Sequence, residues 1–537
     1  LLRPILERLV QADARDPAVQ SIPEALPLLA TEEAVKSDHP NLNYLSVWVA
    51  GSVVDVIKLL KPQFIQHPKV AAYASRALAS QPEAAVIDFL PQLVQVLLCD
   101  PTGQVEEYLM SAAAKAPLFA HRLVWTLGGE EAPPKNTGEM VKRSGWKDPW
   151  LNPNPLWPIV DRMRDRLKAA MHGDALSFFA RESELFDAVT AISGILKPIK
   201  PELRRAAIAQ ELRKIQVKSD DLYLPTNTAA KVVSIATESG RPLQSAPRQT
   251  TAWSVPIMVT FKVKTPEEPA PFSQACIFKV GDDCRQDVLA LQLISLLRDA
   301  WAAANLDVYV FPYGVLPTGY ERGIIEVVPN SFSRNELGVL SDGGLLDMFM
   351  QLFGSVGSHT FEAARQNFIR SSAGYAVASF LLQSKDRHNG NLLIDKMGHL
   401  IHIDFGFIFE ISPGGNLGFE TAGFKLSHEM TQLLDPDGSK RSVHFEQFMH
   451  LCIQAYLVAR QHMDAIMMIV ELMADSGLPC YGRGKARTIA NLRKRFHPEL
   501  SHQEAAAFMR ALILDAYDKW TTRGYDIIQY LQQGITH

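Results

Sequence analysis

Apolar residues recur along the first 127 residues with the spacing of short amphipathic helices, and proline residues separate one helix from the next. The clearest cases are HPKVAAYASRALAS, residues 67–80, and PEAAVIDFLPQLVQVLLCD, residues 82–100. An apolar residue every three or four positions gives a helix one face that can pack against a core. Successive helices of this kind predict an α-solenoid, with a helical bundle as the alternative.

A stretch without periodicity follows at residues 128–158, where Pro, Gly and charged residues predict a linker. Residues 159 to about 215 again have helical spacing. Five segments rich in β-branched and aromatic residues then predict strands, at residues 231–236, 255–263, 274–280, 307–316 and 323–329. Beyond about residue 331 helical spacing returns and continues to the C-terminus.

This order predicts an α+β fold in which a β-rich N-lobe precedes an α-rich C-lobe, and by analogy it is the order of a bilobal, protein-kinase-like catalytic domain. We therefore divide the chain into four parts: a helical domain at 1–127, a linker at 128–158, the N-lobe with its leading helices at 159–330, and the C-lobe with a C-terminal helix at 331–537. The chemistry is expected where the two lobes meet.

Composition narrows the possible partners and the cellular compartment. The net charge of -4 provides no overall field for nucleic acid, so we expect no nucleic-acid partner. Five cysteines without CxxC spacing argue against disulfides or zinc and favour a reducing, cytoplasmic compartment. No apolar run reaches the roughly 20 residues that span a bilayer, so any membrane is met from outside. The opening LLRPILERLV has neither Met nor a signal-peptide pattern, and we expect a longer parent protein.

The stretch SKDRHNGNLLIDKMGHLIHIDFG, residues 384–406, carries the chemistry. Its segments NLLI and HLIHI flank DKMG, a pattern typical of two short strands joined by a Gly-containing turn. Asn391 begins the first strand and Asp404 follows the second, so the hairpin brings two oxygen ligands suited to magnesium together. Asp386 lies in the loop that enters the hairpin and could accept a proton from a hydroxyl group.

A nucleotide site requires a lysine that reaches phosphates. Lys279 ends the strand ACIFKV, and after the GDD turn a helix begins with Asp287 in its first turn, which predicts an ion pair. The segment GIIEVVPNS could offer backbone groups to adenine near Glu326 and Val328. No GxGxxG precedes the lysine, and the candidate phosphate cover is GRPLQSAPR, residues 240–248. This absence, with D-R-H written in place of H-R-D, argues against an ordinary protein kinase.

At these residues the sequence resembles the phosphatidylinositol 3- and 4-kinase superfamily, in which DRHxxN, DFG, the lysine strand and GDDxRQD occur together. More narrowly, FLLQSKDRHNGNLLIDKMGHLIHIDFGFIFEISPGGNLGFE and IFKVGDDCRQDVLALQ look like the type III alpha phosphatidylinositol 4-kinases. The helices of residues 1–127 look like that family's helical accessory domain. The resemblance implies ATP and magnesium as cofactors, a peripheral location at the plasma membrane, and recruitment by adaptor and scaffold proteins.

The resemblance also implies roles for single residues. Asp386 and His388 would handle the proton of the substrate hydroxyl, and magnesium would be bound by Asn391 and Asp404. The residues implied for ATP binding are Lys279, Asp287, Glu326, Val328, Ser245 and Arg248. Arg248 departs from the family pattern because a lysine is usual at that position.

The segment after the DFG indicates the phosphate acceptor by its charge. It holds one lysine, Lys425, among the acidic residues Asp404, Glu410, Glu420 and Glu429. A polyphosphorylated headgroup would need several basic residues, because a single exposed charge pair contributes only about 1 kcal/mol. Unphosphorylated phosphatidylinositol is therefore the predicted lipid, and the choice of the 4-hydroxyl is based on the resemblance of FETAGFKL to the 4-kinases. The alternative for Lys425 is a solvated loop lysine.

A membrane-facing surface is predicted in YGRGKARTIANLRKRF. Its basic residues, which have no acidic neighbours in the segment, are Arg483, Lys485, Arg487, Arg493, Lys494 and Arg495. Each could add about 1 kcal/mol of attraction to an anionic leaflet. A solvated basic loop is the alternative. The final YDIIQYLQQGITH has an apolar helical face that would dock on the kinase core or enter the membrane interface.

Together these features predict a lipid kinase that transfers the ATP γ-phosphate to the 4-hydroxyl of phosphatidylinositol. Three alternatives stay open: a phosphatidylinositol 3-kinase acting on the unphosphorylated lipid, a related protein kinase, and a catalytically inactive scaffold.

Overall fold

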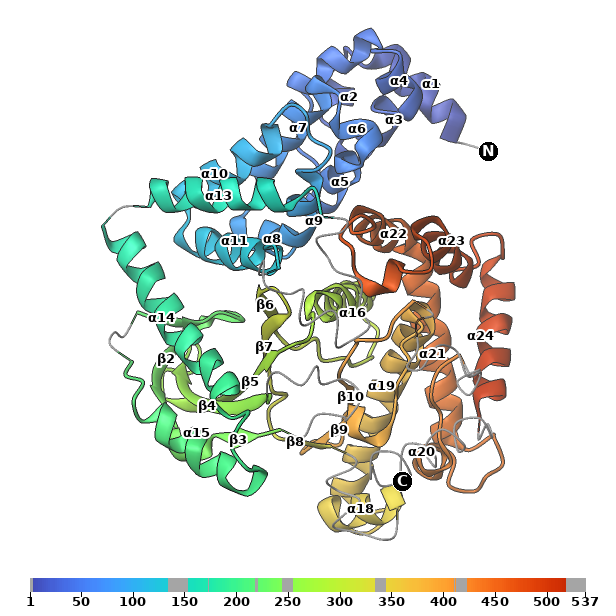
Figure 1. Ribbon diagram of the computed structural model, residues 1–537. Helices are drawn as coiled ribbons and strands as arrows, with labels where there is room; N and C mark the ends of the chain where they lie inside the picture. The colour runs from blue at the N-terminus through green and yellow to red at the C-terminus, as the bar shows by residue number, and fades with distance from the viewer. Residues whose placement is uncertain are drawn as a thin grey trace.

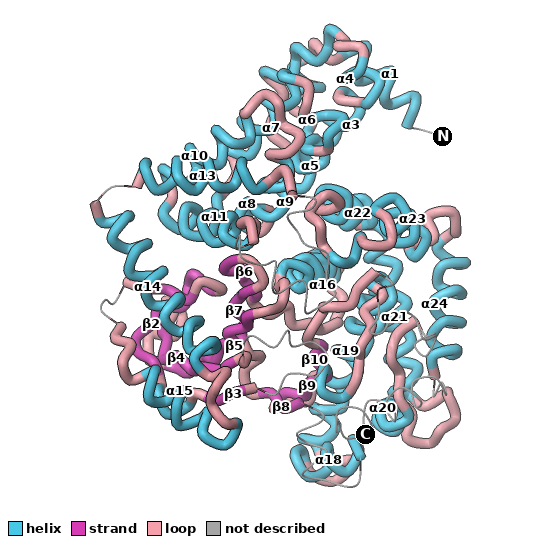
Figure 2. Tube along the Cα trace, in the orientation of Figure 1, coloured by secondary structure: helices cyan, strands magenta, loops and turns pink. Residues whose placement is uncertain are grey.

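The computed structural model describes residues 3–133, 153–171, 173–217, 221–243, 255–333, 344–409, 411 and 423–517. The predicted cover residues Ser245 and Arg248 lie outside these ranges, as do Glu410, Glu420 and the apolar segment at 525–537. Figure 1 shows an N-terminal helical array above a strand-rich lobe, with a helix-rich lobe beside it. Figure 2 shows the strands gathered below the helical array and next to the C-terminal helices. The predicted α+β class, with strands before helices in the catalytic part, is confirmed.

Short helices form the N-terminal array. They are α1 (Arg3–Asp13), α2 (Pro17–Gln20), α3 (Leu26–Leu29), α4 (Glu32–Lys36), α5 (Val53–Ile57), α6 (Pro62–Ile65), α7 (Pro68–Ala79), α8 (Glu83–Ile87), α9 (Leu90–Val96), α10 (Gln104–Lys115) and α11 (Pro117–Gly129). The predicted helix at 82–100 is divided into α8 and α9. Pro91 causes the break, because proline fits the first turn of a helix but clashes with the carbonyl four residues earlier in a helix interior. The α-solenoid stays a prediction.

Helices α13 (Trp157–Ala170), α14 (Asp174–Ile195) and α15 (Arg204–Leu212) lead into an antiparallel seven-stranded sheet. Its strands are β1 (Tyr223–Leu224), β2 (Asn227–Ile235), β3 (Arg241–Pro242), β4 (Ile257–Lys264), β5 (Phe272–Val280), β6 (Val315–Gly319) and β7 (Arg322–Glu326). They lie in the order β1-β2-β4-β5-β7-β6, and β3 pairs with β4. The packed rings of Phe186, Phe261 and Phe278 bury α14 against the sheet and fix the strand that carries Lys279.

The predicted strand at 307–316 is wrong over most of its length, because only Val315 and Leu316 belong to β6. The backbone N–H groups of the preceding residues bond to a helix instead: that of Tyr309 donates to the carbonyl of Arg370, and that of Phe311 to the hydroxyl of Tyr375. The segment therefore runs along α19 (His359–Leu382), where a Cβ on Gly374 would come within 2.7 Å of the Tyr309 carbonyl oxygen. Its apolar residues are buried by that helix and not by a sheet.

The helix-rich lobe surrounds α19, in which 14 of the last 17 residues are buried. The other helices of this lobe are α18 (Gly344–Phe353), α20 (His428–Leu434), α21 (Val443–Gln461), α22 (Met463–Leu472), α23 (Lys485–Arg495) and α24 (His502–Ala516). Helix α16 (Arg285–Ala303), which follows β5, packs between the two lobes against β6, α19, α21 and α22.

 The buried positions of α19 in this part are Phe368, Ile369 and every residue from Ser371 to Leu382, so α19 is the central helix of the lobe.

The predicted hairpin is confirmed. Strands β9 (Leu392–Asp395) and β10 (Leu400–His402) pair antiparallel, with Leu400 opposite Ile394. The turn between them contains Gly398 at φ 90°, a left-handed conformation that glycine adopts without strain. A third strand that the pattern did not predict, β8 (Ser331–Ser333), pairs with β9. Because His402 lies opposite Leu392, the start of β9 next to Asn391 and the end of β10 near Asp404 are on the same side of this sheet.

The helical array is joined to the strand-rich lobe by a buried polar contact. The carboxylate of Glu182, on α14, accepts a hydrogen bond of 3.0 Å from the indole N–H of Trp125, on α11. The same carboxylate oxygen lies 3.0 Å from Nδ1 of His121, and the side chains of this acid and histidine are 0% and 1% exposed. A buried carboxylate depends on such neighbours because it has lost its water.

We expect His121→Ala to lower the free energy of unfolding by about 2–4 kcal/mol, because it leaves the Glu182 carboxylate with one neighbour fewer. Guanidinium titration followed by tryptophan fluorescence measures the change. Arg213→Ala is the matched control: its pair with Glu238 is exposed, and its loss should cost less than about 0.5 kcal/mol. Equal effects of the two substitutions would contradict a structural role for the buried contact.

Candidate active site

Two aspartates of the catalytic stretch have left-handed backbones, with φ 63° at Asp386 and φ 60° at Asp404. This conformation is unfavourable for residues other than glycine and persists only where surrounding contacts hold it. Arg387 supplies those contacts: its buried guanidinium donates to the carbonyls of Lys385, Ile403 and Asp404. The loop with the first aspartate is therefore fastened to the backbone that carries the second.

Asn391 and His388 are arranged around the same loop. The Asn391 side-chain amide donates to the Asp386 carbonyl at 2.9 Å, which leaves its amide oxygen to face a ligand. Nδ1 of His388 accepts the Gly390 N–H at 3.0 Å, so in the neutral ring the proton resides on Nε2. Nε2 lies 3.9 Å from the Asp386 carboxylate. Burial lowers the pKa of His388, which favours the neutral ring.

Lys279, at the end of β5, faces a group of carboxylates. Burial alone would lower its pKa, but the charges of Asp404 and Asp282 outweigh that effect and keep the lysine charged. Burial would likewise raise the pKa of Asp404, whereas Lys279 and Arg387 hold it below its usual range. The lysine and the DFG aspartate are therefore electrostatic neighbours, although they are 125 residues apart in sequence.

The predicted ion pair between Lys279 and Asp287 is not the contact that the structure contains. The ammonium group lies 3.0 Å from Asp282, in the GDD turn. The Asp287 carboxylate instead accepts the backbone N–H of Phe405 at 2.7 Å. Burial and the nearby charge of Asp404 raise the pKa of Asp287. The turn places its own acid within reach of the lysine, and the first turn of α16 places Asp287 against the DFG backbone.

Gln286 adds to the contact between α16 and the DFG backbone, and the sequence analysis did not predict its role. Its side-chain amide donates to the carbonyls of Phe405 and Gly406, at 3.2 and 2.5 Å, and its oxygen accepts the Cys480 N–H at 2.9 Å. Tyr313 is a second missed residue, since its hydroxyl accepts the N–H of Asp404 at 3.1 Å. The adjacent letters R-Q-D were a signal for Gln286, but nothing in the local pattern indicates the tyrosine.

Glu326 and Val328 lie where the strand-rich lobe meets the other lobe. The Glu326 N–H is already bonded to the Gly314 carbonyl, and its carboxylate accepts from Thr226 at 2.8 Å. Burial raises the pKa of this glutamate. Val328 is buried, and within the described part of the chain no acceptor is recorded for its N–H. An open donor of this kind suits hydrogen bonding to a purine ring.

The oxygen donors present suit magnesium. The Asn391 amide oxygen and the Asp404 carboxylate are hard ligands, and magnesium usually takes one or two such protein ligands together with phosphates and water. Among the described residues no group of three or more His, Cys, Asp or Glu side chains is arranged to hold a metal. A site built from these two residues therefore needs the oxygens of a bound phosphate to be complete.

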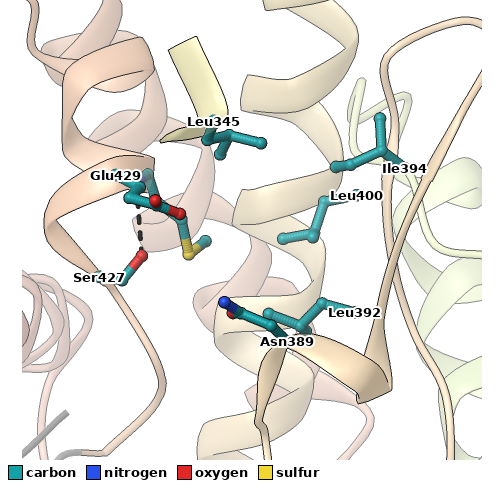
Figure 3. Close-up of a pocket in the computed structure, with 8 residues that line it drawn as sticks. Leu345, Asn389, Leu392, Ile394, Leu400, Ser427 and Glu429 are labelled. Carbon is teal, nitrogen blue, oxygen red and sulfur yellow. Dashed lines mark hydrogen bonds between the residues drawn. The ribbon is translucent and has the colours of Figure 1, made fainter. Parts of the chain in front are cut away.

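Lys425 lies close enough to the catalytic loop for its charge to lower the pKa of His388. Behind that loop a cavity of about 20 Å³ separates Asn389 and the β9–β10 hairpin from the start of α20 (Figure 3). Apolar residues line much of it, namely Leu345, Leu392, Ile394, Leu400 and Met430. This volume holds about one water molecule, so the cavity is too small for a nucleotide.

The predicted membrane contact is wrong for Arg495. Its guanidinium is buried, donates to the carbonyl of Leu381 at 2.8 Å and faces the ring of Phe409. Arg493 and Lys494 are exposed on α23. Helical spacing could have indicated that Arg495 is buried, because positions 488, 492 and 495 share one face of α23 and all three are buried. None of the described helices is both long enough and apolar enough to cross a bilayer.

Family models match two parts of the chain. The model for phosphatidylinositol 3- and 4-kinase matches residues 273–339 and 333–483. The model for the accessory (PIK) domain of the phosphoinositide 3-kinase family matches residues 6–142. The first match contains the lysine strand and the DFG stretch, and the second contains the N-terminal helical array.

Relatives extend the similarity over nearly the whole chain. Phosphatidylinositol 4-kinase alpha 1 of Arabidopsis thaliana is 52% identical over 98% of this chain and 25% of its own length. Phosphatidylinositol 4-kinase alpha 2 of the same plant is 47% identical over 96% of this chain and 95% of its own length. Phosphatidylinositol 4-kinase STT4 of Saccharomyces cerevisiae is 41% identical over 93% of this chain and 26% of its own length.

The chain thus spans about a quarter of the first and third of these proteins and nearly all of the second. The resemblance indicated by the DRHxxN, DFG and GDDxRQD motifs is confirmed by these matches. The chain belongs to the phosphatidylinositol 4-kinase alpha family.

Proposed function

We propose that this chain is a lipid kinase that transfers the γ-phosphate of ATP to the 4-hydroxyl of phosphatidylinositol. The observation that carries the proposal is the convergence of Lys279, Asp404 and the Asp386 loop, which come from three separate parts of the chain. Residues 1–127 would form the accessory domain, 128–158 the linker, 159–330 the N-lobe and 331–537 the C-lobe.

The nucleotide is bound between the lobes. The Val328 N–H donates to the adenine ring beside Glu326, and the Lys279 ammonium lies against the phosphate oxygens, where its charge offsets theirs. Ser245 and Arg248 would cover the phosphates. Because Asp404 and Asp282 keep the lysine charged, it arrives in the protonation state that phosphate binding requires.

The reaction forms a bond between the inositol 4-oxygen and the γ-phosphorus and breaks the bond from that phosphorus to the β,γ-bridging oxygen, so ADP leaves. The proton of the inositol hydroxyl passes to the Asp386 carboxylate. His388 presents Nε2–H 3.9 Å from that carboxylate, where it would donate a hydrogen bond to the incoming hydroxyl oxygen. Most of the acceleration comes from positioning and charge neutralisation, because phosphoryl transfer asks little covalent chemistry of the protein.

Magnesium would be held by Asn391 and Asp404 and would neutralise charge on the phosphate oxygens when bound. The two protein ligands have different tasks before it arrives. The Asn391 amide already braces the loop through the Asp386 carbonyl, and the Asp404 carboxylate is kept ionised by Lys279 and Arg387. Both oxygens are thus presented without rearrangement of the chain.

The acceptor is unphosphorylated phosphatidylinositol, which Lys425 recognises through its single phosphodiester. The charge of Lys425 acts on His388, beside the loop that receives the inositol hydroxyl. The exposed residues of α23, Arg493 and Lys494, face an anionic leaflet, and Arg495 anchors the helix to the lobe. The protein would act as a peripheral enzyme at the plasma membrane, brought there by adaptor and scaffold proteins.

Product analysis tests the proposal directly. Incubation with ATP, magnesium and phosphatidylinositol vesicles should yield phosphatidylinositol 4-phosphate, and Lys425→Ala should lower kcat/KM for the lipid about 10-fold through loss of a charge contact. Lys396→Ala, at an exposed lysine in the hairpin turn, is the control and should leave the rate unchanged. A 3-phosphate product, or phosphorylation of peptides in its place, would overturn the assignment.

We expect Asp404→Asn and Lys279→Met each to lower kcat by at least about 100-fold, because each removes a charge that faces the transferred phosphate. The matched control is Asp395→Asn, a carboxylate on the same hairpin that bonds His399. It should retain activity within about 2-fold in the same product assay. Equal losses in the control would show that damage to the hairpin, and not loss of a phosphate contact, is responsible.

The double variant Arg493→Glu/Lys494→Glu should weaken binding to phosphatidylserine-containing vesicles by at least about 10-fold, since each basic residue contributes about 1 kcal/mol near an anionic surface. Sedimentation with vesicles at two salt concentrations measures this. Arg213→Glu/Lys214→Glu reverses two exposed charges after α15 and serves as the control. If both doubles bind alike, the α23 surface does not face the membrane.

A further inference from the structure

Arg285, the first residue of α16, connects three parts of the molecule. Its guanidinium donates to Asp283 through Nε and Nη2, at 3.0 and 2.7 Å. Nη1 donates to the carboxylate of Glu130 at 2.7 Å and lies 3.4 Å from the carbonyl oxygen of Ser476. One side chain thereby ties the end of α11, the GDD turn and the segment after α22 together.

Glu130 occupies a fixed position in this group. It follows α11 directly, and its side chain is only 6% exposed. The end of α11 cannot shift toward the sheet, because a Cβ on Gly129 would already lie 2.7 Å from the ring of Pro317 on β6. A buried carboxylate on a rigid support fixes the place of the guanidinium that it binds, since either charge left alone would be costly.

The two residues after Arg285 contact the catalytic stretch directly. Gln286 bonds the carbonyls of Phe405 and Gly406, and Asp287 bonds the Phe405 N–H. All three side chains come from the first turn of α16, so they cannot move independently of one another. The contact of Arg285 with Glu130 is thus only one and two residues away, along α16, from the contacts with the DFG backbone.

We propose that Glu130 is a positioning residue for phosphoryl transfer, acting through Arg285 to hold the first turn of α16 against residues 404–406. The inference rests on the proposed lipid kinase function for its activity readout. It assigns a role to the acid that follows α11, far in sequence from the catalytic motifs. Glu130 touches neither nucleotide nor lipid, and its effect is on the orientation of Asp404.

Glu131 provides a matched control in the adjacent position. Its carboxylate bonds Arg164 at 2.9 Å, Arg322 at 3.1 Å and the Tyr320 N–H at 3.2 Å, all away from α16. Glu131→Gln therefore weakens the same junction between the helical array and the sheet without touching the first turn of α16. The two substitutions are chemically identical and differ in the element that they release.

The experiment compares Glu130→Gln with Glu131→Gln in the full chain. We expect Glu130→Gln to lower kcat about 10-fold, with KM for ATP and for phosphatidylinositol changed less than about 2-fold, because orientation and not binding is lost. Hydrogen exchange at the Phe405 amide should be faster in this variant than in the control. Glu131→Gln should keep the wild-type kcat.

A double-mutant cycle tests the route. If Glu130 acts through Arg285, the double variant Glu130→Gln/Arg285→Gln should lose no more activity than Arg285→Gln alone. Additive losses would overturn the proposal, as would a Glu130→Gln variant that is less stable yet has wild-type kcat and wild-type exchange at Phe405. A wild-type chain without lipid kinase activity would contradict the proposed function alone, and the exchange rate at Phe405 would then decide the role of Glu130.

Discussion

The site depends on one lysine held among carboxylates. Lys279 faces Asp282, Asp404 and Asp287, and their combined charge outweighs the cost of partial burial and keeps the lysine protonated. The same lysine keeps Asp404 ionised, so each partner maintains the charged state of the other. The three acids outnumber the two bases Lys279 and Arg387, which leaves local negative charge that a metal cation can neutralise when a nucleotide brings further anionic groups. An arrangement of this kind favours a cation and a phosphate together over either one alone.

The geometry around these charges is held by backbone contacts. Two left-handed aspartates would be costly in a free loop, and Arg387, Gln286 and Tyr313 each bond the backbone next to one of them. These three side chains take no part in proton transfer or phosphate binding in our mechanism. They are positioning residues, since they set the places at which Asp386 and Asp404 present their oxygens.

The sequence carried much of this arrangement in local patterns. The hairpin, the strand that ends at Lys279 and the helix that follows were predicted because strand alternation, turn residues and helical spacing act over a few residues. Two failures arose where distant packing decides: 307–314 lies along α19, and Arg495 is buried by Leu381 and Phe409. The third is partly local, because Asp282 lies three residues from Lys279, while the distant Phe405 N–H occupies Asp287. Charge composition alone cannot tell a buried arginine from an exposed one, and no local pattern places Glu130 beside Arg285.

The end of α11 bears on how this protein can be divided. That helix contributes Trp125 and His121 to a buried contact with α14, and Arg122 donates to the carbonyl of Pro225 close to the charge of Glu326. The N-terminal helical array is therefore joined to the strand-rich lobe through buried side chains of α11. A fragment that began at α14 would therefore expose the buried Glu182 carboxylate and lose the hydrogen bond that Pro225 accepts from Arg122.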